Sequence, residues 1–289
     1  MTSSWMLVAG FFFATMGVFV KFGAEQFDAA EMAFYRSFVG LFFITGLVLV
    51  RGGSVKTRHM GGHAIRSVVG SISLIGYFYA MSKLPLATAQ TLNYTSPIFL
   101  AIATVVVLGE KFSYWLVAAI ALGFVGVAIL LQPTLNGAKE AAALIGLFSG
   151  VFAAWAYLSV RTLGKLGEPD YRVVFWFTVI GSILCAGWQL STSTFHPVRL
   201  DNIWIVIGIG FCGTVAQLAM TRAYRTGNTL VCGALSYSTL VFGAVATFIV
   251  WHEQLAPLEW VGMGVIIASG LLAMRVEKKD EVEEAGFES

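Results

Sequence analysis

The strongest constraint on this chain is a series of long apolar segments, each with about the 20 residues that a helix needs to cross a bilayer core. Ten segments can be marked. They run over residues 5–22, 29–50, 64–83, 86–108, 113–131, 142–160, 171–190, 202–221, 229–251 and 257–275. Transmembrane strands would instead show alternating segments of about 10 residues. The sequence therefore predicts an all-α integral membrane protein with ten transmembrane helices.

Composition leads to the same class of protein. Hydrophobic residues make up 57% of the chain and charged residues 12%, and the mean hydropathy is +0.80. A soluble core of this length cannot hide so much apolar surface. The first segment begins at Trp5 with no basic residue before it and no small-residue cleavage site after it. We therefore expect a retained helix there and not a signal peptide.

The distribution of Lys and Arg predicts the orientation, because these residues are retained on the cytoplasmic side of a membrane. With the N-terminus inside, thirteen Lys and Arg residues, counting Arg66, fall on cytoplasmic segments and four on the opposite side. Both termini are therefore expected in the cytoplasm. The tail, residues 276–289, carries six of the sixteen acidic residues and is expected to be a solvated cytoplasmic end.

A repeat relates the two halves of the chain. An offset of 143 residues aligns "LNYTSPIF" at 92–99 with "LSYSTLVF" at 235–242, and nine of the 31 positions from 80 to 110 are identical to their counterparts. Each half holds five spans, so the second half enters the membrane with the opposite orientation. The sequence predicts two inverted five-helix repeats, residues 1–135 and 140–275. Many secondary transporters are built in this way, although channels can also contain repeats.

The segments "LPLATAQTLNYTSPIFLAIATVVVLGEKFSYWLVAAIALGFVGVAIL" and "LSYSTLVFGAVATFIVWHEQLAPLEWVGMGVIIASGLLA" resemble the drug/metabolite transporter superfamily, in its ten-helix EamA branch. Arg36 and Trp155 fit the same pattern. Two positions depart from it, since Met16-Gly17 replaces a Trp-Gly pair and His252-Glu253 replaces a second Gly-Glu pair. The resemblance implies a secondary transporter of the bacterial inner membrane. Relatives in this branch export amino acids or carry nucleosides, riboflavin-like compounds or S-adenosylmethionine.

Polar side chains on the fourth and ninth spans are the first candidates for a substrate site. At helical spacing, Gln90, Asn93 and Tyr94 share a face of the fourth span, and Ser236 and Tyr237 share a face of the ninth. Hydrogen-bonding groups are costly against lipid, so these faces should meet protein or water. Ordinary interhelical packing is the alternative explanation.

Neighbouring spans add further candidates for the lining of the site. Tyr77 lies on the third span, Trp155 near the middle of the sixth and Gln217 on the eighth. Tyr and Trp around a polar centre suit a flat or aromatic substrate held at one end by hydrogen bonds. This pattern favours aromatic or hydrophobic amino acids.

Acidic residues are missing from the centres of the predicted spans. All sixteen lie in linkers, at helix ends or in the tail, whereas intramembrane carboxylates usually mark a proton pathway. Transport without a coupled ion is expected, and a peripheral acid such as Glu31, Glu110 or Glu253 is the alternative. Arg36 lies about 12 Å along its helix at 1.5 Å per residue. It either snorkels outward beside Glu31, or pairs with a substrate carboxylate or acts in a gate.

Enzyme chemistry has no support in the sequence. The four histidines lie in linkers or at span edges, no Ser-His-Asp set or phosphate-binding loop is apparent, and the three cysteines fall inside spans without metal-site spacing. We expect no catalytic residues, cofactor, metal or nucleic-acid partner. The prediction is a monomeric carrier that moves a small metabolite through the bilayer by alternating access. A channel-like pore or a structural membrane scaffold is the competing class.

Overall fold

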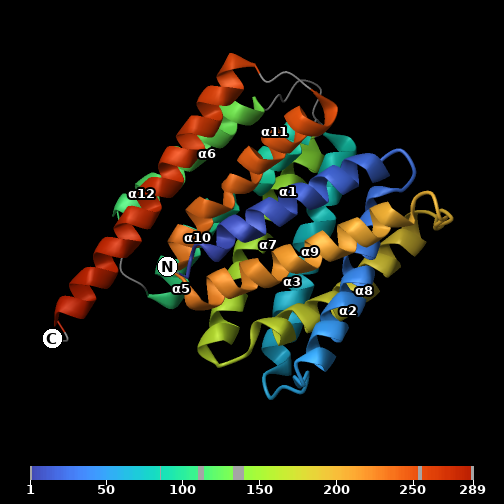
Figure 1. The fold of residues 1–289 in the computed structure, drawn as a ribbon, viewed down its shortest axis with the longest axis horizontal. Helices are drawn as coiled ribbons and strands as arrows, with labels where there is room; N and C mark the ends of the chain where they lie inside the picture. Colours follow the sequence, from blue (N-terminus) through green and yellow to red (C-terminus); the bar gives the residue numbers. More distant parts are fainter. Residues whose placement is uncertain (1, 85, 110–113, 133–139, 253–255, 288–289) are drawn as a thin grey trace.

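The computed structural model describes residues 2–84, 86–109, 114–132, 140–252 and 256–287, and the regular secondary structure within those ranges is entirely α-helical (Figure 1). The helices are α1 (Trp5–Gly23), α2 (Ala29–Val50), α3 (Met60–Lys83), α4 (Leu86–Asn93), α5 (Ser96–Leu108), α6 (Tyr114–Leu131), α7 (Glu140–Lys165), α8 (Asp170–Thr192), α9 (Ile203–Thr226), α10 (Thr229–Ser236), α11 (Ser238–Trp251) and α12 (Pro257–Phe287).

All ten predicted spans are found as helices, and two of them are broken in the middle. The fourth span consists of α4 and α5, and the ninth consists of α10 and α11. The last helix continues past the predicted membrane segment into the charged tail and ends at Phe287. The predicted fold class is confirmed, and the described part of the tail continues α12 as a helix.

By length and hydropathy, nine of the described helical stretches could cross a membrane, and α3 is the span that does not meet this measure. It is 24 residues long, so its composition and not its length sets it apart. Its buried polar residues are His63, Arg66, Ser67, Ser71 and Ser73. A helix with so many polar groups is stable in a bilayer only when other helices surround that face.

The helices of the two halves are interleaved. Residues of α1 pack mainly on α9, and those of α3 pack mainly on α7, which is the same pairing after exchange of the halves. The remaining large contacts, α2 with α8 and α6 with α12, join equivalent helices of the two repeats (Figure 1). Each half therefore covers the other, and neither has a core of its own.

The two breaks occur at equivalent positions and have local chemical causes. In the first, Pro97 lies in the opening turn of α5, where it supplies no N–H, and the Thr95 hydroxyl donates to the carbonyl of Leu92 at 2.6 Å. In the second, the Ser236 hydroxyl donates to the carbonyl of Gly233 at 2.7 Å and competes with the helical ladder. Tyr94 and Tyr237 therefore stand at the ends of two eight-residue half-helices.

A glycine of the opposite repeat lies against each break. A Cβ on Gly150 of α7 would stand 2.6 Å from Thr95 Oγ1 and 3.0 and 3.1 Å from the carbonyl oxygens of Leu92 and Asn93. A Cβ on Gly10 of α1 would stand 2.8 Å from Ser238 Oγ. Only a residue without a side chain allows these close approaches, which shield the freed backbone groups from lipid.

We predict that Gly150→Ala destabilises the protein, although alanine is the better helix former by about 1 kcal/mol. The added methyl group would collide with two backbone carbonyls that cannot move without shifting the break. Gly17→Ala in α1 is the control, because a Cβ there meets nothing within 4 Å. Thermal unfolding in detergent should show a lower Tm for Gly150→Ala and an unchanged or raised Tm for Gly17→Ala. Equal gains in both variants would contradict this account of the packing.

The helices that follow the two breaks end in the same backbone conformation. Gly109 caps α5 with φ 64°, and His252 caps α11 with φ 54°, one repeat offset later. Left-handed backbone is favourable for glycine and costs other residues roughly 1–2 kcal/mol. His252, which replaces the glycine of the first repeat, therefore forms the same helix cap at the cost of backbone strain.

We accordingly expect His252→Gly to raise stability by up to about 1 kcal/mol, and Gly109→Ala to lower it by at least a similar amount. Chemical or thermal unfolding of the two purified variants beside the wild type measures both effects. The opposite signs are the test, since a general effect of glycine on chain flexibility would make His252→Gly the less stable protein.

Candidate substrate-binding site

Tyr94 and Tyr237 meet where the two broken helices lie side by side, with ring centroids 6.3 Å apart. Their environments differ. Tyr237 is fully buried in an apolar cluster with Leu240 and Met263, and a Cβ on Gly123 would come within 2.5 Å of its ring. Tyr94 is only partly buried. Of the two tyrosines, Tyr94 is the one with surface left to meet a ligand.

Asn93 joins the first break to two other helices. Its side-chain amide donates to Ser149 Oγ on α7 at 3.0 Å, and Ser73 Oγ on α3 donates to the carbonyl of Ser149 at 2.8 Å. Ser149 Oγ in turn donates to the carbonyl of Gly146 at 2.6 Å. This chain of hydrogen bonds fixes the position of the break relative to α3 and α7.

The other predicted lining residues of these helices lie in different surroundings. The side chains of Tyr77 and Gln90 interact with each other through a hydrogen bond. Ser236 directs its hydroxyl to its own helix. Trp155 exposes 55% of its surface on α7, whereas its neighbours Ala154 and Ala156 are buried. The structure therefore brings Asn93, Tyr94 and Tyr237 together and sets Trp155 apart from them.

A second polar group surrounds Arg36 on α2. Its Nη2 donates to Gln217 Oε1 on α9 at 3.1 Å, and only 8% of its surface is exposed. Both residues line a small cavity of about 10 Å³. The other lining residues are Ser37, Phe177, Thr178, Gly213 and Thr214. Of the alternatives for Arg36, snorkelling beside Glu31 does not describe this arrangement, because its hydrogen-bond partner is Gln217.

Sequence reasoning missed three residues of this region. Phe177 and Ser37 carried no signal, because an aromatic and a serine among apolar residues are common in membrane helices. Arg66 does carry a signal, because it lies inside the predicted span 64–83, but its place near the cytoplasmic end of that span also fits a solvent-facing charge. In the structure Arg66 is 2% exposed, and its guanidinium carbon lies 4.0 Å from the centroid of the Phe177 ring.

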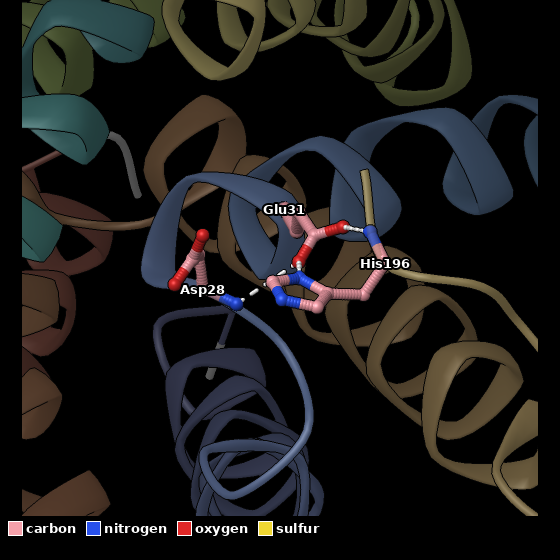
Figure 2. A group of neighbouring side chains, drawn as sticks. All are labelled: Asp28, Glu31 and His196. Carbon is pink, nitrogen blue, oxygen red and sulfur yellow. Dashed lines mark hydrogen bonds and ion pairs between the residues drawn. The ribbon is translucent and has the colours of Figure 1, made fainter. Parts of the chain in front are cut away.

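Glu31 belongs to a separate cluster at one end of the bundle (Figure 2). Its carboxylate accepts a bond from the backbone N–H of Asp28 at 3.0 Å and one from the backbone N–H of His196 at 2.5 Å. The His196 ring nitrogen Nδ1 lies 2.7 Å from Glu31 Oε2. These contacts join the start of α2 to the loop between α8 and α9.

The same three side chains are the described residues that could hold a metal ion, with ligand atoms within 4.8 Å of one another. Both oxygens of Glu31 already accept hydrogen bonds from His196 or from the backbone of Asp28. The buried carboxylate is therefore satisfied by protein groups, and the geometry is that of a helix N-terminal cap extended to a neighbouring loop.

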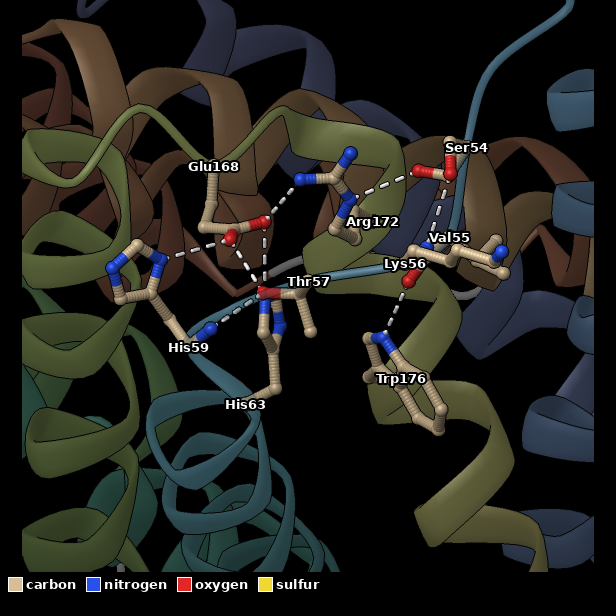
Figure 3. A network of polar contacts seen from close by, with 9 residues as sticks. All are labelled: Ser54, Val55, Lys56, Thr57, His59, His63, Glu168, Arg172 and Trp176. Atoms are coloured by element: carbon tan, nitrogen blue, oxygen red, sulfur yellow. Dashed lines mark hydrogen bonds and ion pairs between the residues drawn. The ribbon is translucent and has the colours of Figure 1, made fainter.

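Glu168 forms the corresponding cluster at the opposite end (Figure 3). It lies in the loop between α7 and α8, and its Oε1 accepts from the Thr57 hydroxyl at 2.5 Å and lies 3.1 Å from His59 Nδ1. Its Oε2 accepts from Arg172 at 2.8 Å and lies 3.2 Å from His63 Nε2. Burial raises the pKa of Glu168, but hydrogen bonds from Thr57, Arg172, His59 and His63 outweigh it and lower the pKa to about 2.

The two clusters are related by the repeat. In each, an acid near the start of the second helix of one half contacts a histidine in the loop after the second helix of the other half. In each cluster the two loops that meet lie on the same side of the membrane if the chain crosses it ten times in alternating directions. Glu110 and Glu253, the other peripheral acids considered for a proton pathway, lie outside the described residues.

The cluster at Glu31 predicts a pH-dependent contribution to stability. The Glu31 carboxylate raises the pKa of His196 above its usual value of 6.5, and Asp28 adds to the effect. A raised histidine pKa stabilises the folded state below about pH 6.5, and the effect is lost as the pH rises through the raised value. The difference in Tm between wild type and His196→Gln should therefore be larger at about pH 5.5 than at about pH 9. In a Glu31→Gln background, the same histidine substitution should give a difference that no longer changes with pH.

Comparison with known proteins identifies the class of this architecture. The EamA-like transporter family matches residues 1–132 and 140–275, one copy in each half. A pseudopaline exporter of Pseudomonas aeruginosa is 29% identical over 94% of this chain and 95% of its own length. A riboflavin transporter of Rhizobium johnstonii is 25% identical over 96% of this chain and 92% of its own.

A solved crystal structure agrees with this fold. It superimposes with a TM-score of 0.83 over 96% of this chain and 98% of its own, at 17% identity. That likeness concerns the fold alone, whereas the family match covers almost the whole sequence. The protein is therefore a secondary metabolite transporter and not an enzyme, and it belongs to the EamA-like transporter family.

Proposed function

We propose that this chain exports a small organic metabolite across the bacterial inner membrane, with amino acids, aromatic or hydrophobic ones above all, as the leading class of substrate. The direction is inferred from the pseudopaline exporter, which is similar over almost the entire chain. The riboflavin transporters among its relatives are consistent with a flat organic substrate. Nucleosides, riboflavin-like compounds and S-adenosylmethionine are the alternative substrates.

The observation that carries this proposal is the pair of helix breaks whose tyrosines, Tyr94 and Tyr237, meet across the two repeats. Broken helices at a repeat interface are where secondary transporters bind substrates, because polar backbone and side chains are present there at membrane depth. Asn93 and the partly buried ring of Tyr94 stand at the first break. An aromatic side chain could stack on Tyr94, and the amino and carboxyl groups could reach Asn93, Gln90, Gln217 and Arg36.

We further propose that the carrier works as a monomer, with both termini in the cytoplasm and without a coupled proton. Without the buried Arg66, twelve cationic residues still face the proposed cytoplasmic side against four on the other. Within the described helices, up to the end of the last membrane span at Val276, the acids lie in first turns, as Glu31, Glu140, Asp170 and Glu259 do. Such positions favour a negative charge without any role in transport.

Counterflow in liposomes tests the proposal. Vesicles that contain the purified protein and are preloaded with unlabelled phenylalanine should take up labelled phenylalanine faster than empty ones, because a loaded carrier returns more readily than an empty one. Tryptophan, leucine, uridine and riboflavin complete the panel. Flux without acceleration by internal substrate would favour the channel-like pore, and no flux for any compound would favour the scaffold.

In that assay, Asn93→Ala should slow exchange by about five- to tenfold, because the substituted side chain can no longer hydrogen-bond to the substrate. The amount of folded protein in the membrane should be unchanged. Val106→Ala is the control, because this residue of α5 is 76% exposed and lies on the outer face. Equal rates for both variants would remove Asn93 from the proposed site.

A further inference from the structure

Two arginines are buried at membrane depth between α2, α3 and α8. Arg36 is the eighth residue of α2 and Arg66 the seventh of α3, and their exposed fractions are 8% and 2%. Because consecutive helices run in opposite directions, the two side chains enter the bundle from opposite faces of the membrane. Each lies on the order of 10 Å from the start of its helix at 1.5 Å per residue.

Both guanidinium groups lie close to the ring of Phe177 on α8. Its ring centroid is 5.6 Å from the guanidinium carbon of Arg36 and 4.0 Å from that of Arg66. Phe177 is the eighth residue of α8, as Arg36 is of α2, so the two lie at a similar distance from the starts of equivalent helices. Since α2 packs on α8, they lie where the two repeats meet, and transporters of this construction bind their substrates at the repeat interface.

The buried polar atoms around this point are hydrogen-bond donors without partners. The list comprises Arg36 Nε, Arg66 Nε and Nη1, Gln217 Nε2, and the hydroxyls of Ser37, Ser67 and Ser71. Guanidinium and amide N–H groups can only donate, and a hydroxyl can turn its hydrogen toward an acceptor. A Cβ on Gly181 would stand 3.1 Å from Ser37 Oγ and 3.4 Å from Ser71 Oγ, so these two hydroxyls face the same point.

No carboxylate of the described residues forms an ion pair with either arginine. Both arginines lie near the same Phe177 ring, so their like charges repel each other. Buried charge without a counter-charge is expensive, and proteins normally pair it with an acid of their own. Among the described residues, the site holds two positive charges and several unpaired donors, and the acceptor that Arg36 does have, Gln217 Oε1, carries no charge.

We propose that Arg36 and Arg66 form one site for an oxyanion, the carboxylate or phosphate group of a transported metabolite. The proposal rests on the transport function proposed above and defines the charge of its substrate. Arginine pairs with carboxylate and phosphate through two parallel hydrogen bonds, and the three serines and Gln217 supply further donors. The cavity of about 10 Å³ admits little more than one water molecule, so the anion enters when the helices separate on one side.

Binding of the anionic group alone tests the site without a known substrate. Purified full-length protein is unfolded thermally in sodium acetate or sodium phosphate, and in sodium chloride of the same ionic strength. Wild type should gain Tm in at least one of the two oxyanion salts relative to chloride. The acetate arm reports a carboxylate site and the phosphate arm a phosphate site. Arg36→Met and Arg66→Met should each lose this gain, with an apparent affinity weaker by about tenfold or more.

Two comparisons separate a ligand site from a structural role. Arg51→Met, at the exposed C-terminal end of α2, should keep the full gain. In chloride, Arg66→Met should be as stable as wild type or more stable, because it removes a buried charge that repels Arg36, whereas a structural arginine would lower Tm when replaced. Equal responses of wild type and both variants to acetate and phosphate overturn the proposal.

Transport and anion binding can fail independently. An oxyanion effect without counterflow of any amino acid would retain the site and reject the substrates proposed above. Counterflow of phenylalanine with an unchanged rate in Arg66→Met would retain the transport function and reject the arginine site. Arg66→Lys keeps the charge but not the bidentate geometry, and a partial loss of the oxyanion effect in it would support direct pairing.

Discussion

A broken helix inside a membrane exposes backbone groups to a medium that cannot hydrogen-bond them, and the rest of this structure is arranged around two such breaks. Each break is covered by the first helix of the opposite repeat, through Gly150 of α7 at Thr95 and through Gly10 of α1 at Ser238. The hydroxyls of Thr95 and Ser236 donate hydrogen bonds to backbone carbonyls near the breaks. The interleaving of the two halves follows, since each half holds the helix that seals the break of the other.

The same arrangement brings unlike residues of equivalent helices together. Arg36 and Phe177 are both eighth in their helices and lie near each other where α2 packs on α8. The difference lets the backbone stay symmetric while the side chains give the centre a charge and an aromatic surface. Substrate selectivity can then change without a change of fold.

Much of the fold could be predicted from the sequence, because the apolar segments and the Tyr94–Tyr237 repeat are local signals that need no knowledge of packing. The sequence indicates the first break through Pro97, whereas the second break contains no proline that would mark it. The burial of Arg66 could not be predicted from the sequence. A cation near the end of a span gives the same sequence pattern whether its side chain reaches water or turns into the bundle. Trp155 is the opposite case, a residue predicted to line the site that lies exposed on α7. Its position near the middle of the span does not show which side of the helix it occupies.

The polar character of α3 has a consequence for how the chain is made. Helices leave the ribosome in order, and α3 reaches the membrane before α7 and α8, the helices on which it mainly packs. Before those helices are made, Arg66 and the serines that they bury would face lipid, so α3 alone is a poor membrane segment. We therefore expect α3 to be held beside the translocation machinery or against α2 until the second half is made. Biogenesis is then a late, concerted event, in which the charge at the centre delays assembly until all its covering helices are present.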